Sequence, residues 1–137
     1  MCVLKAYSAD RSFKKFEETT SIPVYSRVEK GEIRNQERGT CFNEFRISFD
    51  VSERDWDDFP GQVEDATAFL KRWEESLAKF CEEFRPDEFI LDFPLYSRLT
   101  QEIVNQNDYL PRELIRLAGR LGLGIGISTY SRDAFED

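Results

Sequence analysis

Period-two alternation of apolar and polar residues predicts the strands of this chain. The clearest case is residues 45–51, where every second residue is apolar and the residues between them are Arg, Ser and Asp. Four other segments are predicted as strands: residues 2–7, 22–28, 89–95 and 123–130. Pro94 argues for an edge position or a bend late in its strand, because proline cannot donate to a neighbouring strand. Gly124 and Gly126 leave one face of the last strand nearly bare, so that face admits a close neighbour.

Apolar residues spaced three and four apart predict the helices. The longest runs from Val63 to Phe84, between Pro60-Gly61 and Arg85-Pro86. A short helix carries Phe13 and Phe16, and a last one begins at Pro111 and ends at Gly122. Residues 29–40 are predicted as a loop or loose hairpin, and residues 97–108 as irregular chain.

These elements follow one another in the order β-α-β-β-α-β-α-β. The order predicts an α+β fold with a largely antiparallel sheet and its helices on one face. Its first six elements resemble a ferredoxin-like unit by order alone. A length of 137 residues fits one domain, residues 1–137.

Charge and composition narrow the function classes. The chain has 27 acidic and 19 basic residues, a net charge of −8 and no histidine. The negative field disfavours nucleic-acid partners, and the lack of histidine excludes Ser-His-Asp and Cys-His catalysis within the chain. No segment approaches the roughly 18 apolar residues that span a bilayer, and no signal peptide is recognisable, so we expect a cytoplasmic protein without membrane contact. Cys2, Cys41 and Cys81 are expected to be reduced, structural thiols.

The densest acidic segment is residues 50–59, and it also contains two large aromatic residues. We predict a protein-docking patch formed by Glu53, Asp55, Trp56, Asp57, Asp58 and Phe59. A solvated loop with its aromatic residues under the long helix is the plainer interpretation. A metal loop is disfavoured because the EF-hand spacing is absent, and no cofactor is expected. The acidic residues of the C-terminus, Glu136 and Asp137 among them, could extend the negative surface.

Other clusters receive ordinary structural explanations. Arg112, Arg116 and Arg120 form a row on the last helix, where cations complement the helix dipole. The glycines at 122, 124 and 126 precede no helix and so do not predict a phosphate loop. Catalysis, if present, would rest on carboxylates, but no pair is singled out, and the prediction is that the protein is not an enzyme.

The C-terminal third carries a family resemblance. Residues 110–118 read Leu-Pro-Arg-Glu-Leu-Ile-Arg-Leu-Ala, and residues 121–130 read Leu-Gly-Leu-Gly-Ile-Gly-Ile-Ser-Thr-Tyr. This resembles a bacterial family of small domains of unknown function, in which a helix started by proline leads through glycine into an aliphatic strand ending Ser-x-Tyr. The turn Lys30-Gly31-Glu32 fits the same order, but the tryptophan expected soon after it is missing.

In type, the domain is also similar to the immunity proteins of bacterial polymorphic-toxin systems. That resemblance implies a protein that binds and neutralises a cognate, basic toxin domain by stoichiometric occlusion, as a monomer or weak homodimer. Three alternatives remain open: an acidic inhibitor that imitates nucleic acid, a carboxylate-dependent enzyme, and a domain that pairs with itself along the bare face at Gly124 and Gly126.

Overall fold

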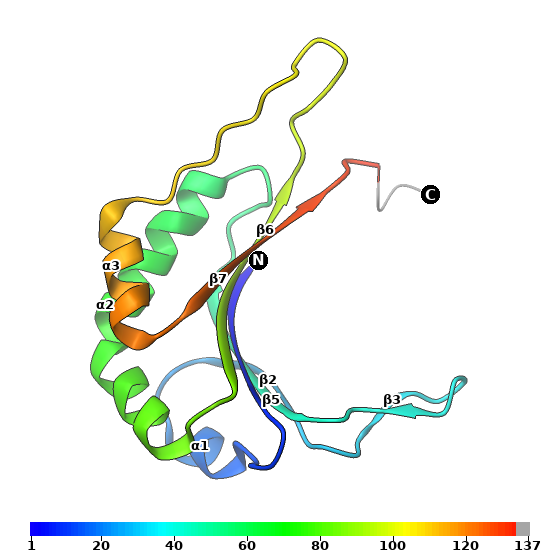
Figure 1. Cartoon of the computed structure of the whole chain (residues 1–137), viewed down its shortest axis with the longest axis vertical. Helices are drawn as coiled ribbons and strands as arrows, with labels where there is room; N and C mark the ends of the chain where they lie inside the picture. Colours follow the sequence, from blue (N-terminus) through cyan, green and yellow to red (C-terminus); the bar gives the residue numbers. More distant parts are fainter. Residues whose placement is uncertain (134–137) are drawn as a thin grey trace.

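A computed structural model describes residues 1–133, which form a curved five-stranded sheet, a small two-stranded hairpin and three helices (Figure 1). The strands of the large sheet are β1 (Cys2–Ser8), β2 (Val24–Val28), β5 (Phe45–Ser52), β6 (Glu88–Tyr96) and β7 (Gly124–Tyr130). The hairpin consists of β3 (Ile33–Asn35) and β4 (Thr40–Cys41), and the helices are α1 (Lys14–Thr19), α2 (Phe59–Phe84) and α3 (Arg112–Leu121). The predicted α+β class is confirmed.

The large sheet has the order β2-β5-β1-β6-β7. Its pairs are antiparallel except β6 and β7, which are parallel and are connected through α3. In both β1-α1-β2 and β5-α2-β6, the two parallel strands are separated by another strand, which is the arrangement of a ferredoxin-like unit. The resemblance suggested by element order therefore extends to strand order, with β7 added beside β6.

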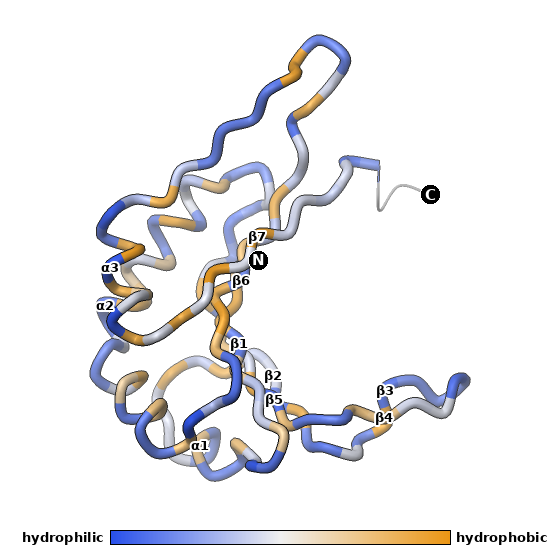
Figure 2. Tube along the Cα trace, in the orientation of Figure 1, coloured by the Kyte–Doolittle hydropathy of each residue, from blue (hydrophilic) through white to orange (hydrophobic). Residues whose placement is uncertain are grey.

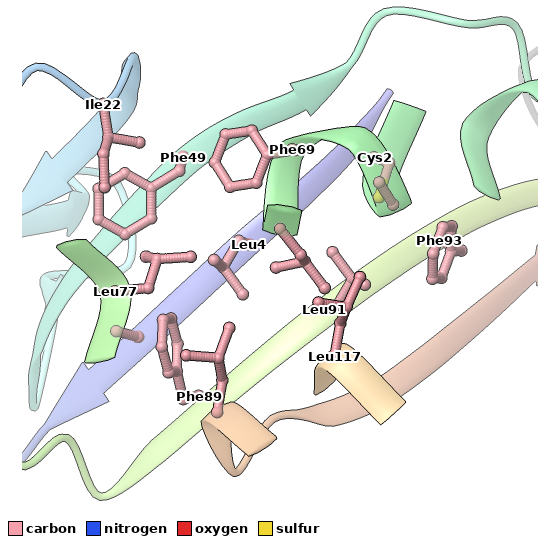
Figure 3. Close-up of a cluster of buried hydrophobic side chains, with 14 of the residues drawn as sticks. Cys2, Leu4, Ile22, Phe49, Phe69, Leu77, Phe89, Leu91, Phe93 and Leu117 are labelled. Carbon is pink, nitrogen blue, oxygen red and sulfur yellow. The ribbon is translucent and has the colours of Figure 1, made fainter. Parts of the chain in front are cut away.

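The core lies between one face of the sheet and the helices (Figure 3). Leu4, Phe49 and Leu91 come from neighbouring strands and are fully buried. Phe80 of α2 stacks on Phe84 and contacts four further phenylalanine rings, from the start of α1 to β6. A cluster of phenylalanine rings therefore fills the end of the core against which α1 packs.

The long helix α2 has a distinct cap at each end. Asp58 accepts a hydrogen bond from the Gly61 amide at its N-terminus. At the other end Arg85 adopts a left-handed conformation, with φ of 43°, before Pro86 prevents the helix from continuing. The structure places the start of the helix at Phe59, slightly before the predicted position.

Pro94 lies in an interior strand, and its surroundings explain how the sheet tolerates it. The pairing of β1 with β6 ends at Asp92, so no strand lies beside Pro94 on that side. There the Pro94 carbonyl accepts a hydrogen bond of 2.8 Å from the Gln62 side chain, and the Tyr96 amide donates to the Trp56 carbonyl. The predicted edge position is wrong, because β6 lies between β1 and β7. At Pro94, however, β6 has no strand partner on the β1 side.

Among residues 1–133, no helix covers the concave side of the sheet (Figure 1). The β3–β4 hairpin projects as an arm at one end of the sheet, and residues 97–111 form a loop that projects at the other end. In Figure 2 the tip of the arm is hydrophilic, whereas the strands of the sheet carry many of the apolar positions. Within residues 1–133, no helix is both long enough and apolar enough to cross a membrane.

Candidate functional site

The acidic and aromatic segment connects β5 to α2 at the end of the sheet where β6 and β7 finish. Two contacts fasten it there: the Trp56 carbonyl accepts from the Tyr96 amide at 3.2 Å, and the Asp55 carbonyl accepts from the Gln62 side chain at the same distance. Gln62 is fully buried, and its amide also donates to the Pro94 carbonyl. One buried side chain therefore ties the segment to β6 and fixes its position.

Trp56 is half-buried in an aromatic cluster with the last residues of β6 and β7. Its ring stacks on Tyr130 with ring centres 4.8 Å apart and an interplanar angle of 24°. It also contacts Tyr96, with ring centres 5.1 Å apart. The Arg132 guanidinium lies over the Tyr96 ring, 5.5 Å from its centre. These contacts hold Trp56 in one orientation, and the residue as a whole is half-buried.

Phe59 does not belong to the surface. It is 3% exposed and packs edge-on against Phe93 of β6, with ring centres 5.5 Å apart. It is the first residue of α2, and its side chain faces the sheet. The inclusion of Phe59 in an exposed docking patch is therefore corrected: this ring contributes to the core.

The four acidic residues of the predicted patch have different surroundings. Asp58 caps α2 and lies 3.6 Å from Arg54, and Asp57 forms an ion pair of 2.5 Å with Arg132. Glu53 and Asp55 are exposed, and among residues 1–133 neither carboxylate has an ion-pair partner. The unpaired negative charge of the segment is therefore concentrated on Glu53 and Asp55 among the described residues. Asp57 could bind another cation only if that cation replaced Arg132.

An open groove of about 430 Å³ adjoins this end of the molecule. One wall is the start of α2 with Asp57, Phe59 and Pro60, and the other is the projecting loop with Arg98 and Tyr109. Tyr109 is 76% exposed. The groove adds exposed apolar area beside the acidic segment.

The concave face of the sheet contains a half-buried polar network. Lys5 of β1 forms an ion pair of 3.1 Å with Asp92 of β6, and the Ser128 hydroxyl of β7 donates to the same carboxylate at 3.2 Å. Asp50 of β5 lies on this face as well, since it and Asp92 are both register partners of Val3. Two strand spacings separate these carboxylates, about 10 Å between their backbones. Within residues 1–133, one oxygen of Asp50 is enclosed without a hydrogen-bond partner.

The arginine row of α3 lies on a charged surface against α2. Arg120 pairs with Glu74 at 3.1 Å, and Lys71 of α2 pairs with Glu113. A shallow groove of about 560 Å³ between the helices is lined by these charges and by Arg116. Gly122 ends α3 in a left-handed conformation with φ of 70°. Arg120 lies in the last turn of α3, where a cation complements the helix dipole, whereas Arg112 is the first residue of the helix and does not fit that explanation.

The three thiols differ in access. Burial raises the pKa of Cys2 strongly, and the neighbouring charge of Asp92 raises it further. Burial also raises the pKa of Cys81, whose thiol contacts the Leu121 carbonyl at 3.8 Å. Cys41 is exposed on the hairpin. All three are free cysteines.

Sequence reasoning missed the residues that complete the site. Tyr96, Tyr130 and Arg132 lie far from Trp56 in the chain and join it only because β6 and β7 end together. The closing Ser-Thr-Tyr carries the family resemblance, and no local pattern in the sequence indicates that Tyr130 contacts Trp56. Within residues 1–133, no group of three or more His, Cys, Asp or Glu is placed to hold a metal ion. Glu136 and Asp137 lie outside the described residues.

Comparison of the chain with known family models, curated proteins and solved structures gives no match.

Proposed function

We propose that this chain is an immunity protein that binds a basic toxin domain and covers its active site. The observation that supports this most is the position of Trp56, held against Tyr96 and Tyr130. Beside it lie the carboxylates of Glu53 and Asp55, which have no ion-pair partner among residues 1–133. The docking surface consists of Glu53, Asp55, Trp56, Asp57, Tyr96 and Tyr130. An anchor that is fixed before binding loses little conformational entropy on association, so its contact area contributes more fully to affinity.

Electrostatics favours a basic partner. The chain has a net charge of −8, and the carboxylates of Glu53 and Asp55 face solvent at the docking surface. Complementary charge accelerates association, while a buried aromatic anchor slows dissociation. A cationic side chain of the partner can also replace Arg132 on Asp57, because both members of that pair are more than half exposed.

The test is co-expression with the C-terminal domain of a secreted protein encoded beside this chain, followed by binding kinetics on the purified pair. We expect Trp56→Ala to weaken binding about 30-fold or more, which corresponds to about 2 kcal/mol. Asp55→Lys is expected to lower mainly the association rate and to reduce its dependence on salt.

Matched controls lie on another face. Trp73 of α2 is also half-buried and stacks under Arg72, so Trp73→Ala removes a comparable ring away from the docking surface. Glu75, whose side chain is 88% exposed, gives the charge control Glu75→Lys. Equal loss of binding in Trp56→Ala and Trp73→Ala would contradict the proposal. Competition by DNA for the partner would instead favour an inhibitor that imitates nucleic acid.

A further inference from the structure

We propose that the free edge of β7 pairs with β7 of a second copy, joining two large sheets into one continuous sheet. β7 lies at the end of the strand order, with β6 on one side and no strand on the other among residues 1–133 (Figure 1). This inference concerns the outer edge of β7, which shares only Tyr130 with the docking surface, and it does not depend on the proposed partner.

β7 lacks the features that normally prevent edge strands from pairing. Such edges carry charges, prolines or bulges. Residues 124–130 contain no charge and no proline, and all seven stay in uninterrupted register with β6. The strand is drawn in orange and near-white in Figure 2. β2, the other edge, follows Pro23, carries Arg27 and has an irregular register between Val24 and Ser26.

The backbone of β7 presents hydrogen-bonding groups at this edge. The Tyr130 carbonyl accepts from the Ser97 amide, so Tyr130 directs its backbone groups toward β6. Backbone directions alternate along a strand, and therefore Ile125, Ile127 and Thr129 direct their N–H and C=O groups outward. Among the described residues, these three have no backbone partner on the outer side.

The strand is complementary to itself in one antiparallel register. A twofold axis at Ile127 places that residue opposite its own copy, Ile125 opposite Thr129 and Gly126 opposite Ser128. All three outward-facing residues then form hydrogen-bonded pairs. Gly124 lies opposite Tyr130, so no second bulky side chain meets the Tyr130 ring, which already stacks on Trp56. Ile127, 46% exposed in the single chain, becomes covered.

Charge also favours this edge as the meeting surface. Two copies that each carry a charge of −8 repel one another, and an uncharged strand brings no further like charges into contact. Because salt screens the remaining repulsion, we expect dimerisation to strengthen as salt is added. Binding of a basic partner has the opposite salt dependence, so the two associations are distinguishable.

The test is sedimentation equilibrium of the full chain over micromolar to millimolar concentrations. We expect a monomer–dimer equilibrium in which Ile127→Lys raises the dissociation constant at least about tenfold, because it places like charges opposite each other. The matched control is Ile33→Lys on the hairpin, where the isoleucine is 62% exposed. It should leave the equilibrium unchanged. A wild-type chain that stays monomeric, or equal effects of the two substitutions, would overturn the proposal.

Cysteine cross-linking tests the register in a Cys41→Ser background. Ile127→Cys places two thiols across the twofold axis, with backbones about 5.5 Å apart and within disulfide range. Thr129→Cys places the two backbones about 14 Å apart, because residue 129 lies four residues along the strand from its own copy. Oxidation should therefore link the first variant and not the second. Linkage at residue 129 without linkage at residue 127 would refute the proposed pairing.

Discussion

Asp58 and Phe59 are neighbours in the acidic and aromatic segment but have different functions in the structure. Asp58 caps α2, and Phe59 enters the core against Phe93. The sequence pattern places both in one segment, whereas the first turn of α2 turns one side chain to the helix end and the other to the sheet. Residue type alone predicts a docking patch that includes both residues, whereas the start of the helix buries Phe59 and gives Asp58 a capping role.

The capping role of Asp58 leads to a stability prediction. Asp58→Ala should lower the free energy of unfolding by about 1 kcal/mol, because the Gly61 amide loses its acceptor. Asp58→Asn, which keeps a capping oxygen, should lower it much less. Urea denaturation of the three proteins measures the difference. Equal losses in the two variants would show that the charge near Arg54, rather than the cap, carries the stabilisation.

The contacts of Trp56 lay beyond prediction from the sequence. Its partners Tyr96 and Tyr130 belong to β6 and β7, which are separated from Trp56 in the sequence by one and two helices. The two tyrosines lie close together because β6 and β7 pair in parallel. Local patterns carry no information on which strands are neighbours. The sequence identified Trp56 as a candidate anchor, and the sheet order supplies the rings that fix it.

At the scale of elements, periodicity predicted nearly all of the large sheet and the helices. Strands such as β5 have one buried face, so their alternation is strong, and α2 has a continuous apolar stripe. The β3–β4 hairpin was predicted only as a loop or loose hairpin, since its strands are exposed throughout and carry no burial pattern. Pro94 predicts an edge strand because proline has no backbone N–H to donate to a neighbour. In the structure β6 is an interior strand, but its neighbour β1 ends before it reaches Pro94.

The loop of residues 97–111 contains an ion pair that can be tested by titration. Burial disfavours the charged form of Asp108, but hydrogen bonds from Gln106 and Arg98 outweigh burial and lower its pKa below 3.8. Because the folded pKa is depressed, this contact stabilises the loop at higher pH and is lost as pH falls through the lowered value.

Nuclear magnetic resonance titration of the Asp108 carboxyl measures that pKa directly. Arg98→Ala should raise it, since the guanidinium lies 2.9 Å from the carboxylate. Arg112→Ala, on α3 and outside this contact, is the control and should leave it unchanged. A pKa that is the same in wild type and Arg98→Ala would exclude Arg98 as the cause.

For the whole molecule, the excess of acidic residues opposes folding. A net charge of −8 produces repulsion in the compact state, which salt screens. We expect the melting temperature to rise as NaCl increases from about 0.02 M to about 0.5 M at neutral pH. Calorimetry in NaCl and in KCl separates screening from binding of a specific ion. A melting temperature that falls with both salts would show that the surface ion pairs outweigh the net repulsion.

The arm formed by β3 and β4 also has a practical consequence. Cys41 is exposed there, whereas burial raises the pKa values of the other two thiols. The arm projects from the opposite end of the sheet to the loop of residues 97–111 (Figure 1). A maleimide tether on Cys41 therefore gives single-site immobilisation on a sensor chip, with the tryptophan end of the molecule directed away from the support.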